Sequence, residues 1–188
     1  ARGLFARSQP VSDQELRGAV EPEKWQAAQD SALGLPSLHS PFFAPDYAGV
    51  IEAMRFDKVQ IAWFGNKSAM EAVDRAGGEV FAQTVDNEGN PGYWSLLVTH
   101  KDSPLNSVED VLKCTGLLNF GIGDPNSTSG FLVPTTYIFA KNNVEPSKCF
   151  KTVRNANHEA NALAAANKQV DVATNNTENM RRLESTNP

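Results

Sequence analysis

The sequence predicts an α/β fold with largely parallel sheets flanked by helices. Two observations support this prediction. From Phe42 onward, short apolar segments alternate with segments whose apolar residues recur at helical spacing, which is the rhythm of strand–helix–strand units. Several of the apolar segments are also continuous rather than alternating, as expected for strands covered on both faces.

In the first half of this region, the expected strands are residues 42–44, 59–64, 79–85 and 93–99. The expected helices are 46–56, opened by Asp46 or Tyr47, and 68–76. The first helix places Val50, Ile51 and Met54 on one face. The run at 86–92, Asp-Asn-Glu-Gly-Asn-Pro-Gly, is dense in turn residues and separates the last two strands.

In the second half, the expected strands are 117–121, 151–154 and 169–173. The expected helices begin at about Ser107 and cover 129–140 and 158–167, and 175–184 is a loop or a helix start. Ser107 is followed three residues later by Asp110, which is the pattern of a helix cap. A polar, glycine-rich loop precedes the helix at 129–140.

The composition favours an ordered domain and argues against a nucleic-acid partner. Of the 188 residues, 40% are hydrophobic and 21% charged, so a substantial core can form. The net charge of −5 argues against binding a phosphate backbone, which rewards basic surfaces. No apolar run approaches the roughly 20 residues that span a bilayer.

Two cysteines, Cys114 and Cys149, match no metal motif, and we expect two free thiols, with a disulfide as the alternative.

Residues 1–40 are a poorly patterned arm with one expected helix at 23–33, which carries Trp25 on its apolar side. The first eight residues contain two arginines and no acid. This pattern fits the remains of an organelle transit peptide, or an ordinary basic terminus.

The strongest chemical signal is the loop Gly121-Ile-Gly-Asp-Pro-Asn-Ser-Thr-Ser-Gly130 between a strand and a helix. Such a junction points unpaired backbone N–H groups at the loop, and the helix dipole favours negative charge there. The hydroxyls of Ser127, Thr128 and Ser129 add neutral donors that can surround the oxygens of a phosphonate or phosphate. The alternative is that these hydroxyls only cap the helix.

Four further side chains are candidates for the same site. Tyr47 and Tyr93 begin a helix and a strand, where side chains point at the carboxyl-end crevice of an α/β sheet, and a phenol can donate to an anion. His158 opens a helix and can also donate. Glu178 could hold a ligand ammonium group. The alternatives are core or rim aromatics and ordinary helix-start or loop residues.

Enzyme chemistry is not indicated. The loop lacks the Gly-Lys-Ser/Thr ending that nucleotide-binding loops require. The sequence contains no Gly-x-Ser-x-Gly elbow and no histidine pair with zinc spacing. We therefore expect no catalytic residues, no metal and no cofactor.

Several long runs resemble the phosphonate-binding protein of bacterial ABC importers, almost without gaps from Phe42 to Asn179. These runs are Phe42-Phe-Ala-Pro-Asp-Tyr-Ala-Gly49, Ile61-Ala-Trp-Phe-Gly-Asn66, Ser68-Ala-Met-Glu-Ala-Val73, Pro91-Gly-Tyr-Trp-Ser95, Gly123-Asp-Pro-Asn-Ser-Thr-Ser-Gly130 and Asp171-Val-Ala-Thr-Asn-Asn-Thr-Glu-Asn179. The resemblance implies a two-lobed type II periplasmic-binding-protein fold, with residues 41–100 in the first lobe and 101–188 in the second.

The resemblance also implies roles for individual residues. The phosphonate group would be held by residues 127–129, with Tyr47 and Tyr93 from the facing lobe and His158 close by. Glu178 would meet the ammonium of an aminoalkyl phosphonate. The family continues past Pro188, and a second acidic ligand, the rest of the second lobe and a second hinge crossing lie in that continuation.

Two functions remain open at this stage. The first is a periplasmic binding module for a phosphonate or similar small oxyanion, with an ABC permease as its protein partner. The second is a shortened descendant that acts as a structural accessory subunit of a larger, membrane-associated mitochondrial complex. Because an incomplete lobe exposes a sheet edge and apolar surface, a protein partner is expected in either case.

Overall fold

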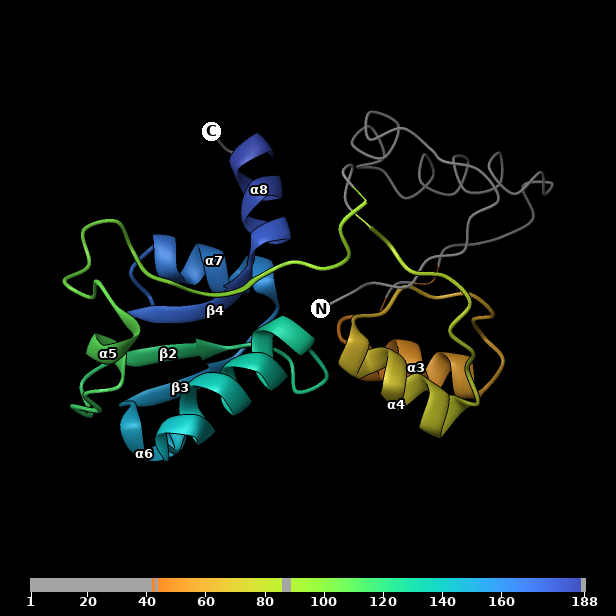
Figure 1. The fold of residues 1–188 in the computed structure, drawn as a ribbon, viewed down its shortest axis with the longest axis horizontal. Helices are drawn as coiled ribbons and strands as arrows, with labels where there is room; N and C mark the ends of the chain where they lie inside the picture. Colours follow the sequence, from red (N-terminus) through yellow and green to blue (C-terminus); the bar gives the residue numbers. More distant parts are fainter. Residues whose placement is uncertain (1–41, 43, 86–88, 187–188) are drawn as a thin grey trace.

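The computed structural model describes residues 42, 44–85 and 89–186. The structure contains a four-stranded sheet. Helices lie on both faces of the sheet, and a pair of helices, α3 and α4, lies beside it (Figure 1). The α/β fold predicted from the sequence is therefore confirmed. The expected arm at 1–40, with its helix at 23–33, lies outside the described residues.

The first described elements are two packed helices, which we call the helical unit. Helix α3 (Tyr47–Arg55) begins where the Asp46 carboxylate accepts a hydrogen bond from the Gly49 N–H, with 2.7 Å between the atoms. Helix α4 (Asn66–Ala76) ends at Gly77, which has the left-handed φ of 64°. Ile51 of α3 is fully buried in a small apolar cluster shared with α4. Both helices match the sequence prediction.

Residues 95–186 form a second part, which we call the sheet unit. Its strands are β1 (Ser95–Val98), β2 (Asn119–Ile122), β3 (Thr152–Asn155) and β4 (Val172–Asn176), in the spatial order β1-β4-β2-β3. Strand β2 is parallel to both β3 and β4, and β1 is antiparallel to β4. The predicted, largely parallel sheet is thus observed with one antiparallel edge strand, and that strand comes from the end of the 41–100 segment.

Helices cover both faces of this sheet. Neighbouring residues of β4 point to opposite faces: Ala173 packs beside Ala165 of α7 (His158–Ala166), while Val172 joins Phe139 in the main core. Phe139 belongs to the continuous helical run η1 (Thr128–Leu132), η2 (Thr135–Phe139) and η3 (Ala140–Asn142). The shorter helix α5 (Val108–Val111), together with α6 (Pro146–Cys149) and α8 (Thr177–Thr186), completes the unit.

The helical run after β2 is wound as a wide π-helix over much of its length. The Leu132 N–H bonds the Ser127 carbonyl, five residues back. Pro134 has no N–H, so in this winding the helix offers no donor to the Ser129 carbonyl. The Ser95 hydroxyl donates to the Ser129 carbonyl, and the Gly123 N–H donates to the Gly130 carbonyl. These two bonds hold this part of the helix against the sheet.

Three predicted strands of the first half are not observed. The structure assigns no strand to Phe42, to Ala44 or to residues 59–64 and 79–85, and residue 43 is outside the described part. A strand exists only as part of a ladder, and the first strand assigned in the described ranges is β1. The apolar side chains that suggested buried strands stay uncovered, with Ile61 53% and Phe81 62% exposed.

The last predicted strand lies three residues further along the chain than expected. Residues 169–173 were predicted, whereas β4 runs from Val172 to Asn176. The sequence pattern missed Thr174, Asn175 and Asn176 because they are polar, yet all three are buried. The amides of Asn175 and Asn176 are hydrogen-bonded inside the sheet unit, which makes their burial tolerable.

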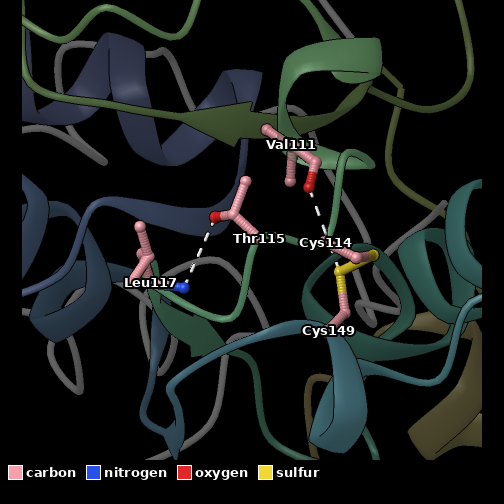
Figure 2. Close-up of a disulfide and its surroundings, with 5 residues drawn as sticks. All are labelled: Val111, Cys114, Thr115, Leu117 and Cys149. Carbon is pink, nitrogen blue, oxygen red and sulfur yellow. Dashed lines mark hydrogen bonds between the residues drawn. A yellow bond between two sulfur atoms is a disulfide. The ribbon is translucent and has the colours of Figure 1, made fainter.

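The expectation of two free thiols is wrong. Cys114 and Cys149 form a disulfide that joins the segment after α5 to the end of α6 (Figure 2). Because β2 and β3 are parallel, the segments that precede them lie at the same end of the two strands, and the two cysteines meet there. The Val111 carbonyl oxygen lies 4.0 Å from the Cys149 sulfur, so the bridge also borders the main core.

We expect the Cys114→Ser/Cys149→Ser variant to lose about 2–4 kcal/mol in free energy of unfolding, because the bridge restricts a loop of 35 residues in the unfolded chain. Urea denaturation followed by circular dichroism measures the loss. Wild-type protein in excess reductant is the control and should match the variant. An identical urea midpoint with and without reductant would contradict the prediction.

Candidate functional site

The candidate site is built where the end of β2 meets the start of η1. A Cβ placed on Gly123 would lie 2.6 Å from the Gly130 Cα, so both positions need glycine for this close approach. The Gly123 N–H donates to the Gly130 carbonyl at 2.9 Å, and the Asn155 side chain donates to the Gly123 carbonyl at 2.7 Å. The loop between the two glycines is thereby held over the carboxyl ends of β2 and β3.

Ser127 and Thr128 lie at the first turn of η1. The Ser127 hydroxyl accepts the Gly130 N–H at 3.0 Å, which is a helix cap. The Thr128 hydroxyl accepts the N–H of Lys67, from the helical unit, at 2.9 Å. Because the first N–H groups of a helix have no acceptor within it, those of Thr128 and Ser129 remain directed at the loop.

Ser129 is the meeting point of the site. Its hydroxyl lies 3.0 Å from Nε2 of His158, and the Asn176 side-chain amide donates to it at 3.3 Å. It also hydrogen-bonds the Tyr93 side chain. Ser129 is 1% exposed, so these partners together replace its contact with water.

Strands β1 and β4 supply two of the contacts to Ser129. Their register pairs Ser95 with Asn176, so both side chains lie on the face that packs against η1. The Ser95 hydroxyl donates to the Ser129 carbonyl at 2.7 Å, the carbonyl that Pro134 leaves without a helical donor. Neither residue was predicted as part of the site. Asn176 lies in the run around Glu178, which the sequence predicted to be a loop or a helix start.

The two tyrosines lie near each other and remain protonated donors. Burial, together with a smaller effect of the neighbouring Tyr93 and Asp124, raises the pKa of Tyr47 to about 12. Burial also raises the pKa of Tyr93, against the opposing effect of its hydrogen bond with Ser129. Tyr47 comes from the helical unit and Tyr93 from the segment before β1, so two distant segments bring the phenols near each other.

His158 is the first residue of α7 and is held from two directions. The Asn175 amide donates to its carbonyl at 2.9 Å, and Asn157 caps the helix by accepting the Ala160 N–H at 2.8 Å. Burial lowers the pKa of the imidazole, so the ring is neutral at neutral pH. Its tautomer sets whether Nε2 donates to the Ser129 hydroxyl or accepts from it.

Glu178 is apart from the buried cluster. It is exposed in the first turn of α8 and forms an ion pair with Arg181, with 3.0 Å between the charged atoms. Its charge still reaches the site, because it raises the pKa of Tyr93. Among the described residues, no group of three or more His, Cys, Asp or Glu side chains could hold a metal ion.

A family model described as ABC transporter, phosphonate, periplasmic substrate-binding protein matches residues 28–188. The chain belongs to this family. The predicted resemblance to the phosphonate-binding family is therefore confirmed.

Relatives within the family are similar over most of this chain. The phosphonates-binding periplasmic protein of Escherichia coli (strain K12) is 60% identical over 174 residues, which are 93% of this chain and 51% of that protein. The phosphate-import protein of Mycolicibacterium smegmatis is 33% identical over 141 residues, 68% of this chain and 41% of that protein. This chain thus spans about half the length of the curated relatives it matches.

A solved structure of the family supports the fold. The binding-protein component of an ABC phosphonate transporter from Pseudomonas aeruginosa has a TM-score of 0.84 and 60% sequence identity, and the match covers 95% of this chain and 58% of that protein. The chain therefore has the α/β fold of a periplasmic binding protein over the part that it shares with this structure, as the sequence predicted. In the described ranges, no helix has both the length and the apolar character needed to cross a membrane.

Proposed function

We propose that this chain is the ligand-holding part of a periplasmic phosphonate receptor that serves an ABC importer. The observation that supports this most directly is the convergence of the Ser129 hydroxyl, the Tyr93 phenol and the His158 imidazole at the start of a helix. Donors gathered there suit a tetrahedral oxyanion. Membership of the phosphonate-binding family supports the same substrate class.

The proposed cradle needs no cationic side chain. The N–H groups of Thr128 and Ser129, the hydroxyls of residues 127–129 and the two phenols would share the phosphonate oxygens. The Ser127 and Thr128 hydroxyls each accept an N–H in the structure, and a hydroxyl that accepts retains its own proton for donation. The partners seen here are therefore compatible with a role as anion donors.

The proposed role of Glu178 is to bind an ammonium group at the far end of the ligand. Its partner in the structure is Arg181, in a solvent-exposed i,i+3 pair. Exposed pairs of this kind contribute about 0–1 kcal/mol, so an arriving ammonium could replace Arg181 at little cost.

The two-lobe division and the partners are part of the proposal. Residues 41–100 would contribute the first lobe and 101–188 the second, with β1 crossing between them. Exposed apolar side chains such as Ile61 and Phe81 suit a surface that other protein segments or a partner cover.

The alternative, an accessory subunit of a mitochondrial complex, has no support from the relatives, whose names place them in periplasmic transport or phosphate import. We propose binding without catalysis.

Thermal denaturation tests the proposal. We expect 1 mM 2-aminoethylphosphonate to raise the melting temperature by several degrees, because a ligand at about 100 times its Kd stabilises a protein by about 2.7 kcal/mol. Inorganic phosphate should give a smaller rise. The Ser127→Ala/Thr128→Ala variant should lose the response. Unchanged melting with both anions would refute the proposal.

A further inference from the structure

The helical unit and the sheet unit contact each other at Lys67, a residue that was not predicted as part of the site. The Lys67 N–H donates to the Thr128 hydroxyl at 2.9 Å. The Lys67 ammonium donates to the Asn126 side-chain oxygen at 3.3 Å. These two bonds bridge 61 and 59 residues of sequence, respectively, and join the first turn of α4 to the loop that precedes η1.

At this contact, the start of α4 and the first turn of η1 lie close together. A Cβ placed on Gly65, the residue that caps α4, would lie 3.2 Å from the Thr128 hydroxyl oxygen. Only a small residue at 65 lets the start of α4 approach η1 this far. Thr128 is 7% exposed and the Lys67 side chain 23%, so both groups are largely removed from water.

The Lys67 side chain is also held from behind. Glu71, one turn further along α4, accepts from its ammonium at 3.4 Å. Arg75 pairs with Glu71 at 3.9 Å and with Glu52 of α3. A charged network on the helical unit therefore directs the ammonium toward Asn126.

Tyr47 depends on this contact for its position. It packs against the apolar cluster shared by α3 and α4, on the helical unit, whereas Ser129 and His158 belong to the sheet unit and Tyr93 interacts with Ser129. Any opening between the two units would move Tyr47 away from the other donors. The contact between the units therefore sets the spacing of the whole cradle.

We propose that Lys67 is a positioning residue for the oxyanion site. Its ammonium donates to Asn126 in the loop before η1, a contact that we call the clasp, and its backbone N–H orients the Thr128 hydroxyl. This inference rests on the proposed function, because it assigns the clasp the task of holding Tyr47 and Thr128 in place for the ligand. The Thr128 hydroxyl accepts from the Lys67 N–H, so its own proton is available for donation to the ligand. Lys67 itself does not touch the anion.

Isothermal titration with 2-aminoethylphosphonate tests the clasp in the whole chain. We expect Lys67→Ala and Asn126→Ala each to raise Kd about three- to tenfold, because the competent arrangement becomes less populated. The double variant should be no weaker than either single one, since both changes remove the same bond. Lys67→Arg should restore affinity to within about twofold. Lys113→Ala, which breaks an exposed ion pair with Asp110, is the control and should leave the Kd for 2-aminoethylphosphonate unchanged.

Hydrogen exchange of the ligand-free protein separates this inference from the proposed function. The Lys67 amide is protected by its bond to Thr128, and we expect it to exchange about fivefold faster in Asn126→Ala. If the wild-type protein binds no phosphonate, the proposed function fails, and faster exchange would still support the clasp. Unchanged exchange, or strictly additive losses of affinity in the double variant, would overturn it.

Discussion

Replacing Ser129 by alanine should raise the Kd for a phosphonate about 10- to 100-fold. The hydroxyl is buried and connects His158, Asn176 and Tyr93, so its loss removes one anion donor and leaves three polar groups without a shared partner. Hydrogen bonds to charged groups contribute about 1.5–3 kcal/mol, which corresponds to this range of affinities. Isothermal titration with 2-aminoethylphosphonate measures the change.

A matched serine elsewhere provides the control for this experiment. Ser185 also forms a hydroxyl hydrogen bond, to the Arg182 carbonyl at 2.7 Å, but it is exposed near the end of α8. Ser185→Ala should bind as tightly as the wild type. Because Ser129→Ala also leaves the Asn176 amide unpaired, its near-ultraviolet circular dichroism must first show a folded protein. Wild-type affinity in folded Ser129→Ala would remove Ser129 from the site.

Replacing Phe120 by alanine should lower the free energy of unfolding by about 3–5 kcal/mol, since a fully buried ring leaves a cavity that neighbours fill only in part. Phe120 lies on the central strand β2. Its ring stacks on Phe150 at 4.5 Å between centroids and meets Phe139 edge-on at 5.3 Å. Urea denaturation followed by circular dichroism measures the loss.

An exposed phenylalanine separates cavity formation from the mere loss of a ring. Phe56, at the end of α3, is 63% exposed, and the Arg55 guanidinium lies over its ring. Phe56→Ala should therefore cost about 0.5 kcal/mol. Equal losses in the two variants would show that the aromatic cluster is not the centre of the fold.

Much of the fold could be predicted from local pattern. The helices at 46–56, 68–76 and 158–167 were recognised because their apolar spacing and caps are local properties, and α3, α4 and α7 lie close to those bounds. The strands at 59–64 and 79–85 were predicted by the same reasoning and are not observed. Apolar character measures a tendency to be buried, whereas a strand also needs a neighbour for its backbone hydrogen bonds.

Part of the site was visible in the sequence, and part was not. The hydroxyls of Ser127, Thr128 and Ser129 were found because a strand, a glycine-rich loop and a helix follow one another along the chain. Asn176 was missed because a polar residue in a buried strand is the reverse of the usual pattern. Lys67 was missed because its partners lie about 60 residues away in the sequence.

The order of the main helices, the strand–loop–helix junction at 121–130 and the family could be recognised from local sequence, because these depend on residue types at short spacings. The Cys114–Cys149 bridge, the buried polar end of β4 and the proximity of Tyr47 to Tyr93 emerge only in the folded structure. Each of these depends on strand pairing or on contact between distant segments. No local pattern records such contacts, because they form only when the whole chain is packed.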